Sequence, residues 1–216
     1  LQRCITNKPM EVLGYGNIRG VNLNYWKKTS KKQDELLTFI FVGRIVREKG
    51  MNELVEAFVK LNQEYPKTRL LLVGPYEEDL DPVSPKTKNL IDTYPSIEAV
   101  GSQKDVRPFY EQSDVLVFPS YREGFPNVVI EAGAMELPSI VTDINGSREI
   151  IKHGENGVIV PSQNEHALWE AMKWMVEHPM EREKMAEKAR PMVAERYEEG
   201  FVRKCLKDYY KKILSC

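Results

Sequence analysis

The chain has 216 residues, of which 42% are hydrophobic, and its formal net charge at pH 7 is −1. This length and composition suit one globular α/β domain with appendages, and the near-neutral charge does not favour a nucleic-acid partner. No apolar run approaches the roughly 20 residues that cross a bilayer, and no basic start with a long apolar core marks a signal peptide. The first residue is Leu1 rather than Met, which indicates a piece of a longer polypeptide.

The cysteines and histidines show no pairing or metal-binding pattern. The cysteines are odd in number and far apart, which favours unpaired thiols in a reducing compartment, and therefore a cytoplasmic location, over a disulfide framework. The histidines have no metal-ligand spacing and lie in polar contexts, so we expect them at the surface. The residues are Cys4, Cys205, Cys216, His153, His166 and His178.

Residues 1–35 fit poorly with an independent start. A short strand is expected at residues 10–13, followed by turn glycines and a polar linker at residues 27–34. We interpret this stretch as the remnant of a preceding domain with its connector.

From residue 36 onward, apolar runs alternate with helical patterns. Strands are expected at residues 36–42, 70–73, 97–100, 115–118, 138–142 and 158–160. Helices are expected at residues 52–64, 86–93, 105–112, 126–135, 148–152, 164–177, 180–196 and 199–214, with Asn52 and Asp105 as N-caps of the first and third. This alternation predicts an α/β fold: a doubly wound, Rossmann-like parallel sheet of about six strands over residues 36–200, with a helical C-terminal tail.

Turn residues follow several of the predicted strands. They are Gly43, Gly74, Gly101 and the stretch at residues 119–124. Because ligands of doubly wound sheets bind beyond the carboxyl ends of the strands, we expect one ligand site at this edge. The first strand–helix turn lacks the G-x-G-x-x-G fingerprint, which disfavours a nicotinamide dehydrogenase.

The stretch at residues 118–131 carries the most chemistry. Gly124 permits close approach of the backbone, and Pro126 is tolerated in the first turn of a helix whose free N–H groups can bind phosphate. Glu123 and Glu131 could accept hydrogen bonds from the hydroxyls of a hexose and a ribose. The alternative is two solvated glutamates beside an ordinary turn.

Two cations lie in the loop after the first strand. Arg44 and Lys49 could neutralise a diphosphate at the same edge, and the alternative is a pair of exposed loop cations.

In this order, several motifs resemble the C-terminal half of family 4 retaining glycosyltransferases of the GT-B fold. They are Gly43-Arg44-x4-Lys49-Gly50, Gly74, Glu123-x7-Glu131, Asn145-Gly146 and Gly154-x2-Gly157. The resemblance covers about residues 36–178. The run at residues 119–127 is especially similar to bacterial members that build polysaccharide or lipid-carried glycan chains.

The resemblance implies a domain that binds a nucleotide-diphospho-sugar, with a UDP-sugar favoured, for hexosyl transfer to a glycan or lipid-linked acceptor. It implies diphosphate contacts for Arg44 and Lys49, and sugar contacts for Glu123 with the backbone of Gly124, Phe125, Pro126 and Asn127. It also implies distal-phosphate contacts for the N–H groups near Val128 and Val129, ribose contacts for Glu131, and base contacts for residues 102–106. The donor-binding set therefore includes Gly43, Gly74 and Val106, and the catalytic roles fall to Glu123, Arg44 and Lys49.

The D-x-D triplet at Asp79 and Asp81 follows no apolar strand and precedes Pro82, so we expect it in a solvated loop. Members of this family need no metal or other cofactor, so the resemblance implies that the triplet is idle. The fold has two Rossmann-like domains, and this chain supplies one, so we expect donor binding with poor transfer and an acceptor held by the missing N-terminal domain.

Residues 201–216 are expected to form the crossover helix, with an apolar stripe that would be partly exposed. Its opposite face is basic, so a peripheral contact with the inner face of the cytoplasmic membrane is an alternative to a solvated surface.

Two other functions stay open. One is a sugar-nucleotide epimerase of similar fold, which would need further acid–base carboxylates that we cannot place. The other is a nucleotide-binding module without catalysis.

Overall fold

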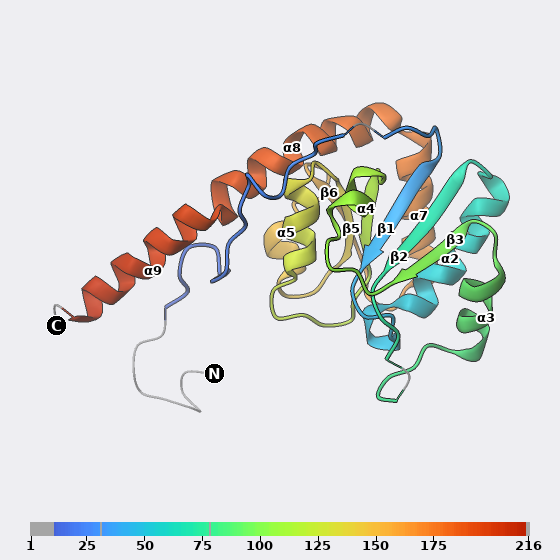
Figure 1. Cartoon of the computed structure of the whole chain (residues 1–216), viewed down its shortest axis with the longest axis horizontal. Helices are drawn as coiled ribbons and strands as arrows, with labels where there is room; N and C mark the ends of the chain where they lie inside the picture. Colours follow the sequence, from blue (N-terminus) through green and yellow to red (C-terminus); the bar gives the residue numbers. More distant parts are fainter. Residues whose placement is uncertain (1–10, 31, 78, 215–216) are drawn as a thin grey trace.

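The computed structural model describes residues 11–30, 32–77 and 79–214. Within them, six strands form one sheet in the order β3-β2-β1-β4-β5-β6, and every pairing is parallel (Figure 1). The strands are β1 (Leu37–Val42), β2 (Thr68–Val73), β3 (Ile97–Gly101), β4 (Val115–Phe118), β5 (Ser139–Thr142) and β6 (Gly157–Val160). The predicted doubly wound α/β fold is confirmed.

Helices cover both faces of the sheet. They are η1 (Arg47–Lys49), α2 (Met51–Glu64), α3 (Pro85–Thr93), α4 (Arg107–Glu111), α5 (Asn127–Ala134), α6 (Ser147–Ile150), α7 (Glu165–Glu177), α8 (Pro179–Tyr197) and α9 (Glu199–Leu214). Helix α2 packs against α3 and α7, whereas α5 packs against α8 (Figure 1). This division is what a doubly wound sheet with right-handed crossovers requires.

The core follows directly from the apolar runs. Strands β4 and β5 are buried along their whole length, and β1 is buried from its second residue, as expected for parallel strands covered on both faces. Phe41 of β1 stacks on Phe118 of β4 with ring centroids 5.9 Å apart. Helix α2 buries Leu54, Phe58 and Leu61 on the predicted face.

Several local predictions are wrong. Residues 11–13 contain no strand, and Met10 lies outside the described residues. Asn52 is not the N-cap of α2, because the helix begins at Met51 after Gly50 in the left-handed conformation (φ 72°). The Asn52 side chain instead accepts a hydrogen bond from the Ser84 N–H at 3.0 Å.

Helix α4 is shorter than expected, and its N-cap is Val106 rather than Asp105. Asp105 still accepts a hydrogen bond from the N–H of Arg107, the first residue of the helix, at 3.0 Å. The Asp105 side chain therefore binds a main-chain N–H at the start of the helix, although the N-cap residue is Val106.

Residues 17–26 are bound to the two C-terminal helices. The N–H of Val21 donates to the Tyr197 carbonyl (2.8 Å) and its carbonyl accepts from the Glu199 N–H (3.1 Å), so Val21 bridges the break between α8 and α9. Arg190 of α8 donates to the carbonyls of Trp26 (2.6 Å) and Leu23 (2.7 Å). The segment therefore runs along the helices rather than away from them (Figure 1).

Helix α9 extends beyond the sheet (Figure 1). Val202 is buried and Cys205 is half-buried with a free thiol, whereas Ile213 is 50% exposed. The expected apolar stripe is thus partly exposed. Cys4 and Cys216 lie outside the described residues. In the described part of the chain, no helix combines the length and apolar character that a membrane span requires.

Candidate functional site

The sequence order of the strands reverses between β1 and β4, which are parallel neighbours in the sheet but far apart in sequence. The loops after these two strands lead to helices on opposite faces, so a crevice opens at their carboxyl ends. Tight glycine contacts hold these loops together. A Cβ on Gly74 (φ 148°) would lie 1.9 Å from the Gly43 carbonyl oxygen, and one on Gly50 would lie 2.2 Å from the Pro119 carbonyl oxygen.

Lys49 and Glu123 meet across this crevice. Lys49 Nζ lies 2.5 Å from Glu123 Oε1, and the two side chains are only 13% and 17% exposed. The ammonium is also 5.9 Å from the centroid of the Phe118 ring. Lys49 and Glu123, two predicted site residues that are 74 positions apart in sequence, therefore form one mostly buried ion pair.

Arg44 does not join this pair. Its guanidinium contacts the carboxylates of Glu48 (3.1 Å) and Glu77, and its side chain is 46% exposed. Any anion that binds Arg44 must therefore compete with two carboxylates for its N–H groups.

The loop after β4 is fixed by main-chain and side-chain bonds. The Tyr121 N–H donates to the Glu48 carbonyl at 2.9 Å, and the Tyr121 hydroxyl donates to Glu53 at 2.7 Å. Burial, followed by the hydrogen bond to Glu53, raises the pKa of Tyr121 well above its usual value. The loop that carries Glu123 is thus anchored to both η1 and α2.

The glycine at position 124 lies against the loop after β5, since a Cβ on Gly146 (φ 83°) would be 2.7 Å from the Gly124 carbonyl oxygen. The Phe125 ring packs edge-on against Tyr197, with centroids 5.6 Å apart. The side chain of Phe125 is therefore engaged in packing, which leaves its main chain as the part available to a ligand.

Pro126 lies one residue outside the helix that was predicted to include it, because α5 begins at Asn127. The Asn127 side chain accepts a hydrogen bond from Asn17 at 3.1 Å. Val128 is half-buried and Val129 is buried. The Val129 N–H donates to the Pro126 carbonyl at 3.1 Å, so this predicted phosphate donor already has a partner.

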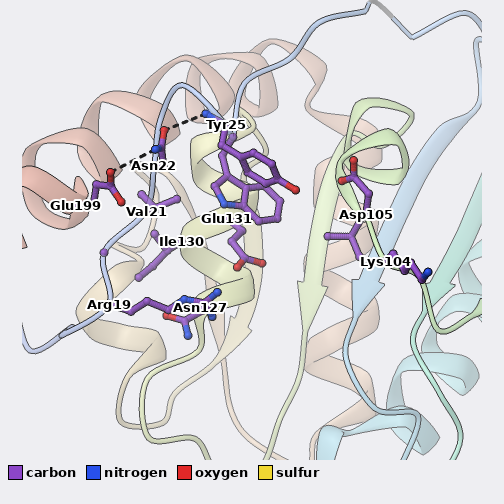
Figure 2. A pocket seen from close by; sticks show the side chains of 13 residues that line it. Arg19, Val21, Asn22, Tyr25, Lys104, Asp105, Asn127, Ile130, Glu131 and Glu199 are labelled. Atoms are coloured by element: carbon purple, nitrogen blue, oxygen red, sulfur yellow. Dashed lines mark hydrogen bonds between the residues drawn. The ribbon is translucent and has the colours of Figure 1, made fainter.

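Beside the start of α5 lies a pocket of about 440 Å³ (Figure 2). Its walls come from residues 19–26, from the loop at Lys104, Asp105 and Val106, from α5, and from Glu199. Figure 2 shows the Glu131 side chain extending from α5 toward the loop that carries Lys104. The pocket brings the predicted residues Val106, Asn127 and Glu131 together.

Glu131 is a half-buried carboxyl group. Burial raises its pKa above the ordinary value, and the positive charge of Arg19 opposes this shift. A carboxylate held in a partly desolvated pocket is a strong acceptor for hydroxyl groups.

The wall at residues 19–26 was missed as part of the site, because the sequence assigned it to a preceding domain. Tyr25 stacks on the Arg107 guanidinium, whose carbon lies 3.8 Å from the ring centroid. Arg107 is held by Asp105 at 2.6 Å, and hydrogen bonds from Arg107 lower the pKa of Asp105. The aromatic pair Tyr25-Trp26 was the available signal, since adjacent aromatics in a polar segment indicate a surface that packs or binds.

The fold and the site together define a Rossmann-like domain with a polar crevice at the topological switch point and a pocket beside the start of α5. Residues 24–192 match the family model described as glycosyl transferases group 1. The chain belongs to this family of glycosyltransferases.

Individual relatives support the same assignment. The chain is 29% identical to the capsular polysaccharide biosynthesis glycosyltransferase CapM of Staphylococcus aureus, over 94% of this chain and 56% of that protein. It therefore spans about half the length of that relative.

Two solved structures share the fold. The C-terminal domain of the glycosyl transferase group 1 protein LpcC of Francisella tularensis superposes with a TM-score of 0.74 at 23% identity, over 83% of this chain and 99% of that domain. Anabaena HepE in complex with UDP-glucose gives a TM-score of 0.77 at 17% identity, over 91% of this chain and 56% of that chain.

Proposed function

We propose that this chain is the donor-binding half of a retaining glycosyltransferase and that it binds a nucleotide-diphospho-sugar, with a UDP-sugar favoured. The observation that carries the proposal is the Lys49–Glu123 ion pair at the switch point. This ion pair and the pocket that contains Glu131 lie at the same carboxyl edge of the sheet. The complex of HepE with UDP-glucose supports the choice of ligand.

Each group has a role that its chemistry suits. Glu131 accepts hydrogen bonds from the ribose hydroxyls, and the loop at Lys104–Val106 lies against the base. Lys49 neutralises the diphosphate as a mobile point charge. Glu123, which Lys49 already contacts, accepts hydrogen bonds from the hydroxyls of the transferred sugar.

The protein's part in transfer is positioning and charge stabilisation. When the glycosidic bond to the diphosphate breaks, negative charge grows on the leaving phosphate, and Lys49 and Arg44 stabilise that charge. Arg44 must first exchange its bonds to Glu48 and Glu77 for bonds to phosphate. No metal and no covalent nucleophile is required in this proposal.

The acceptor is proposed to be a glycan or lipid-linked saccharide, in line with the capsular polysaccharide biosynthesis of CapM. It would be held by an N-terminal domain, because this chain spans only part of such relatives. We also propose that the full protein acts in the cytoplasm, at the inner face of the membrane where a lipid-linked acceptor would be presented.

Calorimetric titration with UDP, GDP and ADP in the absence of metal tests this function. One diphosphate should bind selectively, and Lys49→Ala and Glu131→Lys should each weaken binding at least tenfold, the loss of about 1.4 kcal/mol. Lys86→Ala serves as the control, because Lys86 of α3 forms an ion pair with Glu56 of α2 and its side chain is 66% exposed. A folded chain that binds none of the three, or variants that bind as the parent does, would overturn the proposal.

A further inference from the structure

The D-x-D triplet in the loop after β2 has a use that does not involve a metal. Asp79 is exposed, whereas the side chain of Asp81 is only 22% exposed and points toward η1. Asp81 Oδ2 accepts a hydrogen bond from the Glu48 N–H at 2.6 Å, and Oδ1 accepts one from Arg47 Nε at 3.0 Å. Both carboxylate oxygens are therefore occupied by donors.

The bond to the Glu48 N–H is the stronger part of this contact. Arg47 is 65% exposed, and exposed ion pairs contribute little to stability. A short hydrogen bond from a main-chain N–H to a carboxylate is charge-assisted, and it fixes the peptide of a single 3-10 turn that has no other side-chain cap. The Arg47 N–H also donates to the Asp81 carbonyl at 3.1 Å, so the two loops are joined by main chain as well.

Glu48 is also the point where a third loop attaches. Its carbonyl accepts the Tyr121 N–H at 2.9 Å, and its carboxylate contacts Arg122 at 3.2 Å. Residue 48 is thus bound by the loop after β2 on its N–H side and by the loop after β4 on its carbonyl side. The next residue is Lys49, which contacts Glu123 of that same β4 loop.

We propose that Asp81 is a positioning residue for the diphosphate site: by holding the Glu48 peptide, it sets the place of the Lys49 ammonium opposite Glu123. This inference rests on the proposed function, since it assigns Lys49 to the diphosphate. It gives the D-x-D triplet a role in donor binding without a metal ion.

The test compares Asp81→Ala, Asp81→Asn and Asp79→Ala for binding of UDP and UMP, or the matching pair of whichever base the parent chain selects. Asp81→Ala should weaken UDP binding about tenfold and UMP binding by less than about twofold, because only the second phosphate relies on the placement of Lys49. Asp81→Asn keeps an oxygen that accepts the Glu48 N–H, so it should restore most of the affinity. Asp79→Ala and Arg47→Ala are matched controls and should bind as the parent does.

Thermal unfolding followed by circular dichroism establishes that each variant is folded, and Asp81→Leu, which also lacks an acceptor for the Glu48 N–H, replaces Asp81→Ala if that variant does not fold. Equal losses for UDP and UMP would overturn the inference, because a general loosening affects both ligands. It would also be overturned if Lys49→Ala abolished UDP binding while Asp81→Ala left it intact, an outcome that leaves the proposed function standing. If the parent chain binds no nucleotide, the proposed function falls and this inference with it.

Discussion

The Lys49–Glu123 pair permits a quantitative test of the crevice geometry. Exposed ion pairs contribute about 0.2–1 kcal/mol, whereas breaking a buried pair costs about 3–5 kcal/mol. With side chains that are 13% and 17% exposed, this pair falls between the two cases. We therefore expect Lys49→Met to lower the free energy of unfolding by about 2 kcal/mol, and the double-mutant cycle with Glu123→Gln to give a coupling of about 1–2 kcal/mol.

The assay is urea unfolding of the parent, both single variants and the double variant, with a matched cycle on Lys86 and Glu56. That control pair is 2.8 Å apart, but its side chains are 66% and 29% exposed, so its coupling should stay below about 0.5 kcal/mol. A loss of 2 kcal/mol corresponds to a fall in Tm of about 4–8 °C for a chain of this size. Equal couplings for the two pairs would refute the reasoning, because burial would then make no difference.

Three further outcomes are expected. Gly74→Ala should cost about 3 kcal/mol or more in urea unfolding, since its Cβ would lie 1.9 Å from the Gly43 carbonyl oxygen, whereas Gly101→Ala, with open space around it, should cost only about 1 kcal/mol. Arg190→Met should cost about 2–4 kcal/mol in the same assay, because its bonds to main-chain carbonyls of residues 23–26 are lost. Burial raises the pKa of Glu131, so its ionisation reduces stability above that pKa and has no effect below its unfolded value. Glu131→Gln should therefore raise Tm at about pH 8, with a gain that shrinks toward about pH 4, while nucleotide titration shows weaker binding; a gain independent of pH would contradict the assignment.

The strands could be predicted from sequence because burial on both faces leaves a continuous apolar run. The strand at residues 115–118 matches the structure at both ends, and the others differ by one or two residues. Helix starts were harder. Asn52 has the right chemistry for an N-cap, but Gly50 reaches the left-handed conformation that ends η1 and lets α2 begin at Met51.

The site was only partly predictable for a related reason. Motif order indicated Lys49 and Glu123, and the structure brings them together, whereas Arg44 contacts Glu48 and Glu77. No local sequence pattern predicts that Glu77 pairs with Arg44, since this contact depends on how the loops meet in space. The same holds for residues 19–26, whose part in the pocket depends on helices about 170 residues later in the chain.

The Val21 bridge has a consequence for the order of folding. Contacts between residues far apart in sequence form late, because closing a long loop costs entropy before the contact can form. On the ribosome, the sheet can assemble once β6 has emerged, but Val21 must wait for Tyr197 and Glu199. The wall of the pocket beside α5 is thus completed last, and a chain released before α9 would hold an assembled sheet with an open pocket.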